Sequence, residues 1–446
     1  MEITLSKGAK EAIDRLFCQG FEAYGVGGCV RDFIMGKVPN DFDITTNALP
    51  EQIVSCFAGY RVIETGIKHG TVTVIIDGEP LEITTYRIDG DYKDNRRPES
   101  VKFVSDIKYD LARRDFTVNA MAYSHRAGLV DVFGGIDDIE NKIIRCVGDP
   151  DRRFEEDALR IMRALRFASV LGFDIHSGTK TSIHKNKELL KNISNERIFS
   201  ELCKLICGKN AENILLEFKD VIATIIPELE ASIDFDQMSK YHCYDVYEHT
   251  VKTLAATKPD LITRLAALFH DCGKPAACSF DGEHRHFMGH DKIGKDITFS
   301  ALKRLKANNI TVKTVSKLVG MHDARVQGTE KSVKKLLAVM SYEEFLKFAD
   351  LRDADRSAHA KGYEIPNPSA QELIAIADKI ISDNACLKIS DLAVNGEDLK
   401  GVGIAPGKEM GLILKRLLEL VMDQKCTNSK EELLLIAQKL KKDQKY

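Results

Sequence analysis

Hydrophobic and polar positions alternate in two different ways along this chain. Up to about residue 145, segments with helical periodicity are interrupted by β-branched segments in which apolar residues recur at every second position. Residues 71–77 and 81–87 are the clearest of these and are joined by a Gly-Glu-Pro turn, while 102–106 and 128–133 are further strand candidates. The pattern predicts a small sheet backed by helices.

From about Asp151 onward the strand patterns almost disappear, and the chain is typical of successive helices broken by short polar turns. Residues 153–172 have the strongest helical periodicity, and we predict one helix that ends at Gly172. The Pro-Asn-Pro segment 366–368 indicates a boundary before a last helical segment. We therefore predict an α+β fold, with a small mixed sheet followed by an all-helical remainder.

Composition narrows the class of protein without identifying it. The 446 residues suffice for two to four domains, and 44% hydrophobic with 29% charged residues is typical of a globular protein. No apolar run reaches the roughly 18 residues of a membrane span, and the N-terminus is typical of a short amphipathic helix rather than a signal peptide. We therefore expect no membrane contact. The 11 cysteines contain no CxxC pair, so we expect reduced thiols and a cytoplasmic location. Because the net charge is -3, any RNA-binding surface must be a local basic patch.

Two short motifs lie close together near the N-terminus. Gly27 and Gly28 precede a predicted helix start, where backbone amides and the Arg31 guanidinium can meet a triphosphate. Asp41 and Asp43 follow within ten residues, and on a strand their carboxylates share one face, where they can hold Mg²⁺. Either motif alone is common in unrelated proteins, but the pair indicates nucleotide transfer.

A two-metal site commonly uses a third carboxylate, and we predict Glu82 for this role. Its strand is expected to pair beside the strand that carries Asp43. Asp77 is the rival candidate, and either residue can also be an exposed acid at the end of a strand.

Arginines dominate two further motifs. Arg113 and Arg114 are adjacent, and burying both without an anion would be costly. We expect Arg114 to bind a triphosphate while Asp115 and Asn119 hold the loop around it.

The second arginine-rich motif lies in the predicted helix 153–172. On a helical projection Arg160, Arg163 and Arg166 lie opposite an apolar arc, with Asp157 at its edge. Such a helix alone would have an ordinary charged outer face. Following a phosphate-binding segment, its Asp and Arg side chains can instead offer donors and acceptors to a base edge.

Five segments together resemble class II CCA-adding tRNA nucleotidyltransferases in order and spacing, over about the first 200 residues. They are GGCVRD (27–32), DFDI (41–44), RIDGDYKDNRRPESVKFV (87–104), RRDFTVNAMA (113–122) and EEDALRIMRALRF (155–167). The resemblance implies a palm-like head (1–145), a helical neck with the base-recognition helix (146–235), a body (236–365) and a tRNA-contacting tail (366–446). It implies tRNA, CTP and ATP as partners, and no obligate protein partner.

The resemblance also assigns roles. It implies that Asp41 and Asp43 hold Mg²⁺, and that Gly28, Arg31 and Arg114 bind the nucleotide phosphates. It further implies that Asp157 and Arg160 select CTP and then ATP, that Arg163 and Arg166 line the same pocket, and that the loop 89–97 shifts specificity between the bases.

Most histidines lie in the C-terminal half. An adjacent pair, His270-Asp271, closes a predicted helix, with His249 upstream and Asp355 on a later helix. Imidazole and carboxylate ligands together suit a divalent transition metal and an activated water.

FHDCGKP (269–275) resembles the HD phosphohydrolase superfamily. The resemblance implies the four residues above as ligands of Ni, Mn, Co or Mg, with Lys274 near a phosphate and an additional phosphohydrolase activity. His290 and His322 would extend the site.

Three alternatives stay open. A bacterial poly(A) polymerase shares the head but tends to carry a basic C-terminal extension, which this slightly acidic chain does not have. A narrower enzyme would add only CC or only A. A regulatory HD phosphohydrolase with a nucleotide-binding N-terminal half would not need the Asp41–Asp43 pair.

Overall fold

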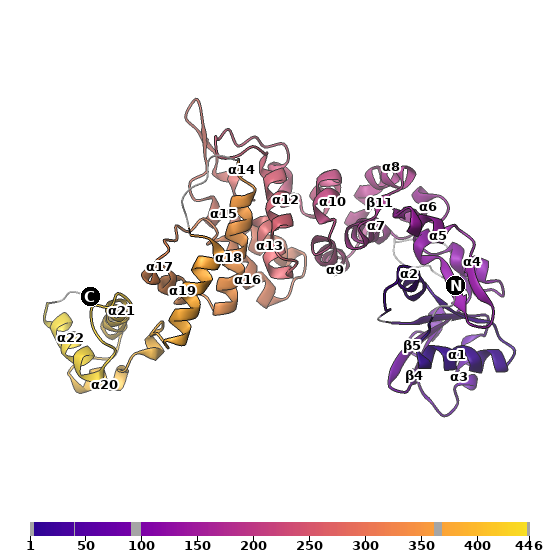
Figure 1. The fold of residues 1–446 in the computed structure, drawn as a ribbon, viewed down its shortest axis with the longest axis horizontal. Helices are drawn as coiled ribbons and strands as arrows, with labels where there is room; N and C mark the ends of the chain where they lie inside the picture. Colours follow the sequence, from indigo (N-terminus) through magenta and orange to yellow (C-terminus); the bar gives the residue numbers. More distant parts are fainter. Residues whose placement is uncertain (1–3, 40, 91–99, 361–367, 444–446) are drawn as a thin grey trace. The chain divides into compact units, whose positions relative to one another are not determined.

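The computed structural model describes residues 4–39, 41–90, 100–360 and 368–443. Its contacts divide the chain into two compact units, residues 1–230 with 301–307, and residues 231–300 with 308–446 (Figure 1). The division near residue 230 lies close to the predicted end of the neck at 235. The boundaries between the four predicted domains stay a prediction.

A seven-stranded mixed sheet forms the centre of the first unit, in the order β3-β4-β5-β2-β1-β8-β9. Its strands are β1 (Ala23–Val26), β2 (Asp43–Thr46), β3 (Arg61–Ile63), β4 (Thr71–Ile76), β5 (Glu79–Thr85), β8 (Met121–Ser124) and β9 (Gly128–Asp131). Within this sheet β2 and β5 run parallel and the other neighbours antiparallel. The sheet and its helical continuation confirm the predicted α+β fold.

One face of the sheet is covered by α1 (Lys7–Cys18) and α3 (Pro50–Cys56) (Figure 1). The alternation in β4 buries Val72, Val74 and Ile76 against these helices, as period-two patterning requires. Residues 102–106, predicted as a strand of the sheet, contribute instead to β7 (Val101–Phe103), which pairs with β6 (Arg87–Asp89) in a separate ribbon.

The rest of the first unit is helical. Its helices are α2 (Gly28–Ile34), α4 (Ile107–Ala112), α5 (Gly135–Glu140), α6 (Pro150–Glu156), α7 (Leu159–Leu171), α8 (Ser177–Asn186), α9 (Asn195–Ile206), α10 (Ala211–Glu217) and α11 (Lys219–Ile225). Among them, α7 and α9 pack against each other most extensively.

The prediction of one helix over residues 153–172 is wrong at one position. Asp157 adopts an extended conformation (φ −139°, ψ 101°) and separates α6 from α7. Its carboxylate accepts the Leu159 amide at 3.1 Å, a local bond that competes with helical continuation. The predicted end at Gly172 is confirmed, because this glycine adopts the left-handed conformation (φ 69°) that ends many helices.

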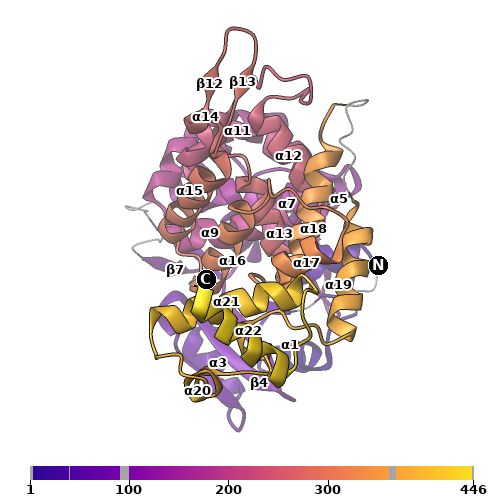
Figure 2. The same cartoon turned by 90° about the vertical axis from the view of Figure 1, so that its left-hand side faces the viewer.

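The second unit is almost entirely helical. Its helices are α12 (Val246–Ala256), α13 (Leu261–Phe269), α14 (Lys274–Ala277), α15 (His290–Arg304, whose last residues belong to the first unit), α16 (Asn309–Val319), α17 (Glu330–Leu337), α18 (Tyr342–Ser357), α19 (Ala370–Ser382), α20 (Gly396–Gly401), α21 (Lys408–Met422) and α22 (Lys430–Asp443). Helices α12, α13, α16 and α18 pack together, and a short hairpin of β12 (Ser279–Phe280) and β13 (Arg285–His286) follows α14 (Figure 2).

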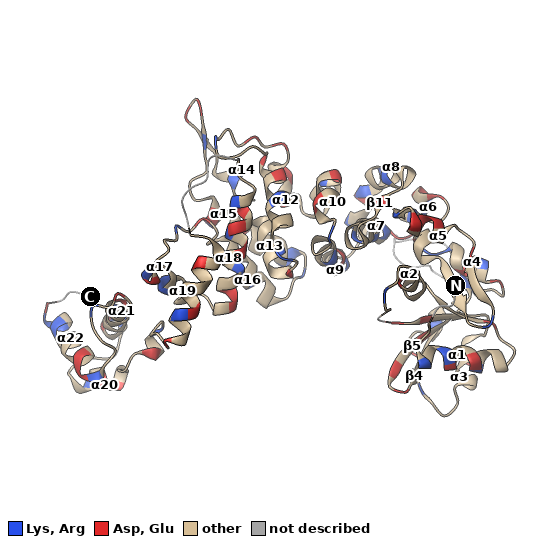
Figure 3. Cartoon of the chain, in the orientation of Figure 1, with Lys and Arg blue, Asp and Glu red and all other residues tan. Residues whose placement is uncertain are grey.

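A separate small core lies at the C-terminal end, where α20, α21 and α22 bury residues such as Leu399, Ile413 and Leu433. Helix α19 packs instead against α17 and α18. Figure 3 shows basic and acidic residues interleaved along the helices of this unit. Within the described ranges, no helix combines the length and apolar character that crossing a membrane requires.

Candidate active site and candidate metal centre

Three acidic residues gather at one end of the central strands of the sheet. Asp43 begins β2 and lies opposite Val26 on β1 and opposite Glu82 on β5. Asp41 lies two residues before Asp43, and all three acidic side chains are exposed. The strand pairing predicted for Glu82 is therefore present.

Asp77, the rival third acid, lies elsewhere. Together with Gly78 it forms the two-residue turn between β4 and β5, and its φ of 50° fits such a turn. Because Glu82 is aligned with Asp43 and Asp77 is in the turn of the hairpin, the geometry favours Glu82.

The surroundings of Asp43 disfavour the negatively charged form of its carboxyl group. Desolvation by the surrounding protein, together with Glu82 and Asp41, raises the pKa of Asp43 to about 6, while Arg114 opposes this shift. Since its side chain stays accessible, a cation can approach this carboxylate and relieve the repulsion. Exposed carboxylates beside each other are the oxygen ligands that Mg²⁺ prefers, so the residues present fit this ion.

The glycine turn brings the backbone close to Arg114. Gly27 has φ 78° and ψ −124°, and a Cβ there would lie 3.1 Å from Arg114 Nη1. Gly28 then begins α2. Asp110, fully buried, accepts from Arg114 at 3.3 Å and from the Thr45 hydroxyl of β2 at 3.1 Å. Asp110 thus links Arg114 to the strand that carries Asp43.

A hydrogen-bonded chain connects α2 to α7. Arg31 donates to Asn119 at 2.7 Å, Asn119 donates to Asp115 at 3.1 Å, and Arg163 donates to Asp115 at 2.8 Å. Burial opposes the charge of Asp115, but Arg163 and Asn119 outweigh it and hold its pKa at about 2. The contacts agree with the predicted role of Asp115 and Asn119 in fixing this loop.

The arginines of α7 are not on a solvated outer face. Arg160 is 8% exposed and donates to Glu156 at 2.7 Å and to the Arg113 carbonyl at 3.1 Å. Arg166 forms an ion pair of 2.5 Å with Glu201 on α9.

Asp157 is held from α9 as well, by Arg197 at 3.1 Å. Sequence reasoning missed Arg197 and Glu201, which lie about forty residues away and carry no local signal.

The second unit contains a dense cluster of histidines and acids. His249 on α12, His270 and Asp271 at the end of α13 and Asp355 on α18 come together as predicted. His249 Nε2 lies 2.8 Å from Asp355 and 3.5 Å from Asp271, and His270 Nε2 lies 3.2 Å from Asp271. The predicted four-residue set is therefore assembled.

The cluster extends in two directions. His290 and His322 lie 3.5 and 3.6 Å from the other carboxylate oxygen of Asp271. His242 and His359 lie beside His249, and sequence reasoning missed both. The spacing of four residues between Asp355 and His359 on one helix is the signal that could have found the latter.

The imidazole orientations fit a bound cation. His270, His290 and His322 each place Nδ1 2.7–2.8 Å from a backbone carbonyl, which leaves Nε2 of each facing the cluster. Fixing the ring in this way is typical of histidines that bind metal. The Nε2 atoms of His290 and His322 lie 3.1 Å apart. When Nδ1 of each of these two rings carries the proton, both Nε2 atoms are acceptors, and they face each other unless a cation lies between them.

Charge in this cluster is strongly perturbed. Burial disfavours the charged form of His270, but Asp271 and Asp355 outweigh it and raise its pKa to about 10. Burial lowers the pKa of His249. Burial, together with the charge of Lys274, lowers the pKa of His242 to about 3. Lys274 Nζ lies 2.6 Å from Asp271, so the positive charge of this lysine is beside the histidine cluster.

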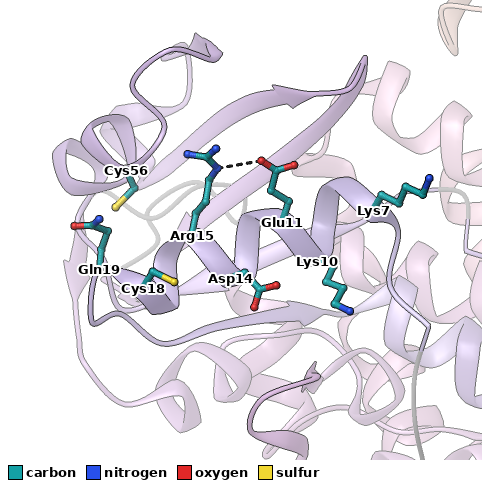
Figure 4. A pocket seen from close by; sticks show the side chains of 8 residues that line it. All are labelled: Lys7, Lys10, Glu11, Asp14, Arg15, Cys18, Gln19 and Cys56. Atoms are coloured by element: carbon teal, nitrogen blue, oxygen red, sulfur yellow. Dashed lines mark hydrogen bonds and ion pairs between the residues drawn. The ribbon is translucent and has the colours of Figure 1, made fainter.

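Two cavities differ in their relation to these sites. One of about 360 Å³ is lined by Cys243, Tyr244, Lys252, Ser357, Ala358 and His359, so it opens beside the histidine cluster. A groove of about 550 Å³ follows α1 and contains no predicted site residue. Figure 4 shows its polar side chains, of which Glu11 and Arg15 pair with each other at 3.1 Å.

Comparison with known proteins identifies the class. The family model "Poly A polymerase head domain" matches residues 23–145, "Probable RNA and SrmB- binding site of polymerase A" matches 172–233, and tRNA nucleotidyltransferase domain 2 matches 292–437. These matches and the fold of the first unit define a nucleotidyltransferase.

Whole-length relatives narrow this class. A CCA-adding enzyme of Lactobacillus helveticus is 35% identical over 92% of this chain and 91% of its own, and one of Limosilactobacillus fermentum is 35% identical over 97% of both. The crystal structure of the Bacillus stearothermophilus CCA-adding enzyme in complex with CTP covers 98% of both chains, with a TM-score of 0.74 and 27% identity. The chain belongs to the CCA-adding enzyme family.

Proposed function

We propose that this protein adds or repairs the 3′-terminal CCA of tRNA, using CTP and ATP without a nucleic-acid template. The alignment of Asp43 with Glu82, next to Asp41 and close to Arg114, carries this proposal. A Thermotoga maritima relative has been solved with tRNA and the Bacillus stearothermophilus relative with CTP, which supports the choice of substrates. The motif set favours the class II subgroup, and the scattered cysteines, taken as reduced thiols, favour a cytoplasmic location.

Each group has a place in the reaction. The 3′-hydroxyl of tRNA attacks the α-phosphate of the nucleotide, the new phosphodiester bond forms, and pyrophosphate leaves. Asp41, Asp43 and Glu82 would hold Mg²⁺, which supplies activation of the hydroxyl and charge stabilisation of the leaving group. Gly28, Arg31 and Arg114 bind the triphosphate through backbone amide and guanidinium donors.

The incoming base is read by Asp157 and Arg160, with Arg163 and Arg166 lining the same pocket. The extended conformation of Asp157 supports this proposal, because it takes the residue out of the regular helix between α6 and α7, and Arg197 then fixes its carboxylate at 3.1 Å. Part of the loop 89–97, proposed to shift specificity, lies outside the described residues. The tail from residue 366 is proposed to contact tRNA.

We infer a second activity for the histidine cluster, a metal-dependent phosphohydrolase of the HD type. His249, His270, Asp271 and Asp355 would hold Ni²⁺, Mn²⁺, Co²⁺ or Mg²⁺, which polarises a water to a nucleophile. Lys274, whose Nζ lies 2.6 Å from Asp271, would bind a phosphate oxygen of the substrate. Small phosphoesters or 2′,3′-cyclic ends of RNA are the proposed substrates.

A substrate panel separates these proposals from the alternatives. The protein is incubated with tRNAs that end before the CCA, after the first C and after CC, and with an unstructured RNA. Extension of all three tRNAs to one CCA end supports the proposal. Extension of only some tRNAs indicates a CC-adding or A-adding enzyme, and long adenosine tracts on the unstructured RNA indicate a poly(A) polymerase.

The regulatory alternative needs a second arm. Hydrolysis without nucleotide addition by the unaltered protein would support a regulatory HD phosphohydrolase. Addition that is lost in an Asp41→Asn/Asp43→Asn variant, with hydrolysis retained, would reveal two separate enzymes in one chain.

A further inference from the structure

Phe167 on α7 lies in contact with three arginines at once. The guanidinium carbons of Arg31, Arg163 and Arg166 are 5.2, 5.3 and 3.8 Å from the centroid of its ring. Phe167 is 7% exposed, and its ring is fixed by an edge-to-face contact with Phe116 at 5.8 Å. A single rigid ring therefore borders guanidinium groups from both α2 and α7.

The three guanidinium groups repel one another as well as attract acids. Each has one carboxylate partner, Asp32 for Arg31, Asp115 for Arg163 and Glu201 for Arg166. Burial lowers the pKa of Arg166, and the charges of Arg163 and Arg31 lower it further. The three guanidinium groups are therefore close enough to repel one another. The negative face of an aromatic ring attracts cations and limits the rotamers that they can adopt.

We propose that Phe167 is a positioning residue for nucleotide binding, because its ring holds the guanidinium groups of Arg31, Arg163 and Arg166 together. This inference rests on the proposed assignment of these arginines to the nucleotide pocket. Phe167 itself is buried and acts through the arginines. The carboxylates assigned to the chemical step lie on other elements, so the ring acts on nucleotide binding more than on the reaction rate.

The test compares three variants. Phe167→Leu keeps apolar volume but removes the ring, and Phe167→Tyr keeps the ring. Phe218→Leu is the matched control, because Phe218 is fully buried in the same unit and its ring stacks on His184. Steady-state addition of CTP and ATP is measured with the full-length chain, together with inhibition by pyrophosphate and the Tm.

Phe167→Leu should raise KM for both nucleotides and the inhibition constant of pyrophosphate by about tenfold. Each cation–ring contact is individually modest, but the variant loses three of them at once. We expect a much smaller change in kcat, and recovery of KM in Phe167→Tyr. Phe218→Leu should lower the Tm without changing KM.

An unchanged KM in Phe167→Leu would overturn the inference, as would a KM in Phe167→Tyr as high as in Phe167→Leu. Arg163→Ala separates this failure from failure of the proposed function. If Arg163→Ala raises KM and Phe167→Leu does not, only the role of Phe167 is wrong. If neither changes KM, the assignment of the arginines to the nucleotide pocket is also wrong.

Discussion

Asp43 on β2 and Glu82 on β5 lie directly opposite each other in a parallel strand pair of the sheet. Side chains aligned in this way leave the same face of the sheet, so the two carboxylates can share one ion. Asp77 belongs to the same hairpin as Glu82 but occupies its turn.

This difference makes Asp77 a matched control for variants of Asp43 and Glu82. Asp43→Ala and Glu82→Gln should each reduce the rate of nucleotide addition at least about hundredfold, because both remove a metal ligand from the reacting phosphate. Affinity for tRNA should persist, since it comes mainly from phosphate contacts. Asp77→Asn should be as active as the unaltered chain, and near-normal turnover of Asp43→Ala would refute the assignment. Rates come from single-turnover assays and affinity from filter binding.

Base selection can be tested at Asp157 and Arg160. Replacing either by Ala should blur discrimination among the four nucleoside triphosphates more than it weakens their binding. A wrong base is normally excluded because it leaves buried polar groups unpaired. The matched control is Arg152→Ala, since Arg152 lies on the preceding helix with its side chain 74% exposed. Competition between CTP and UTP measures the effect, and continued strict exclusion of UTP and GTP would contradict the proposal.

Two of the three adjacent His-Asp pairs in the second unit, His270-Asp271 and His322-Asp323, allow a similar comparison. Asp271→Ala should abolish hydrolysis of 2′,3′-cyclic AMP and of a generic phosphomonoester in the presence of Ni²⁺, Mn²⁺, Co²⁺ or Mg²⁺, because Asp271 contacts four histidines. CCA addition should survive. Asp323→Ala is the control, since Asp323 follows His322 in the same way but is exposed. Absence of both bound metal and hydrolysis in the unaltered protein would mean that the cluster is only structural.

Asp115 predicts a dependence of stability on pH. Its pKa of about 2 in the folded state lies below the usual value of a free aspartate. The stabilisation is therefore fully present above about pH 4 and is lost as the pH falls toward 2, and it is on the order of 2 kcal/mol. Asp115→Asn should be less stable at neutral pH and should lose less free energy of unfolding between pH 5 and pH 3. Urea titrations measure both, and equal pH slopes would argue against the ion pair with Arg163.

Local patterning predicted some relationships well and others not at all. Glu82 was found because alternation identifies a strand and a short turn fixes its neighbour. The break at Asp157 was missed because apolar periodicity continues across it. The backbone conformation there is instead stabilised by the hydrogen bond that the Leu159 amide donates to the Asp157 carboxylate.

Long-range partners had no such signal. Arg197 reaches Asp157 only because α9 packs on α7, and nothing in the residues around Arg197 indicates this contact. His242 shows the same limit, since a single histidine upstream of a helix carries no ligand spacing. His270-Asp271 was recognisable because an adjacent pair at the end of a helix is a local pattern.

The most direct test supplies one nucleotide at a time to a tRNA that lacks its 3′ end, and resolves the products at single-nucleotide length. We expect CTP alone to add two residues, ATP alone to add none, and both together to give one terminal adenosine after two cytidines. GTP and UTP should not be used. Addition of adenosines by ATP alone, or no extension with any nucleotide, would contradict the proposed CCA-adding activity.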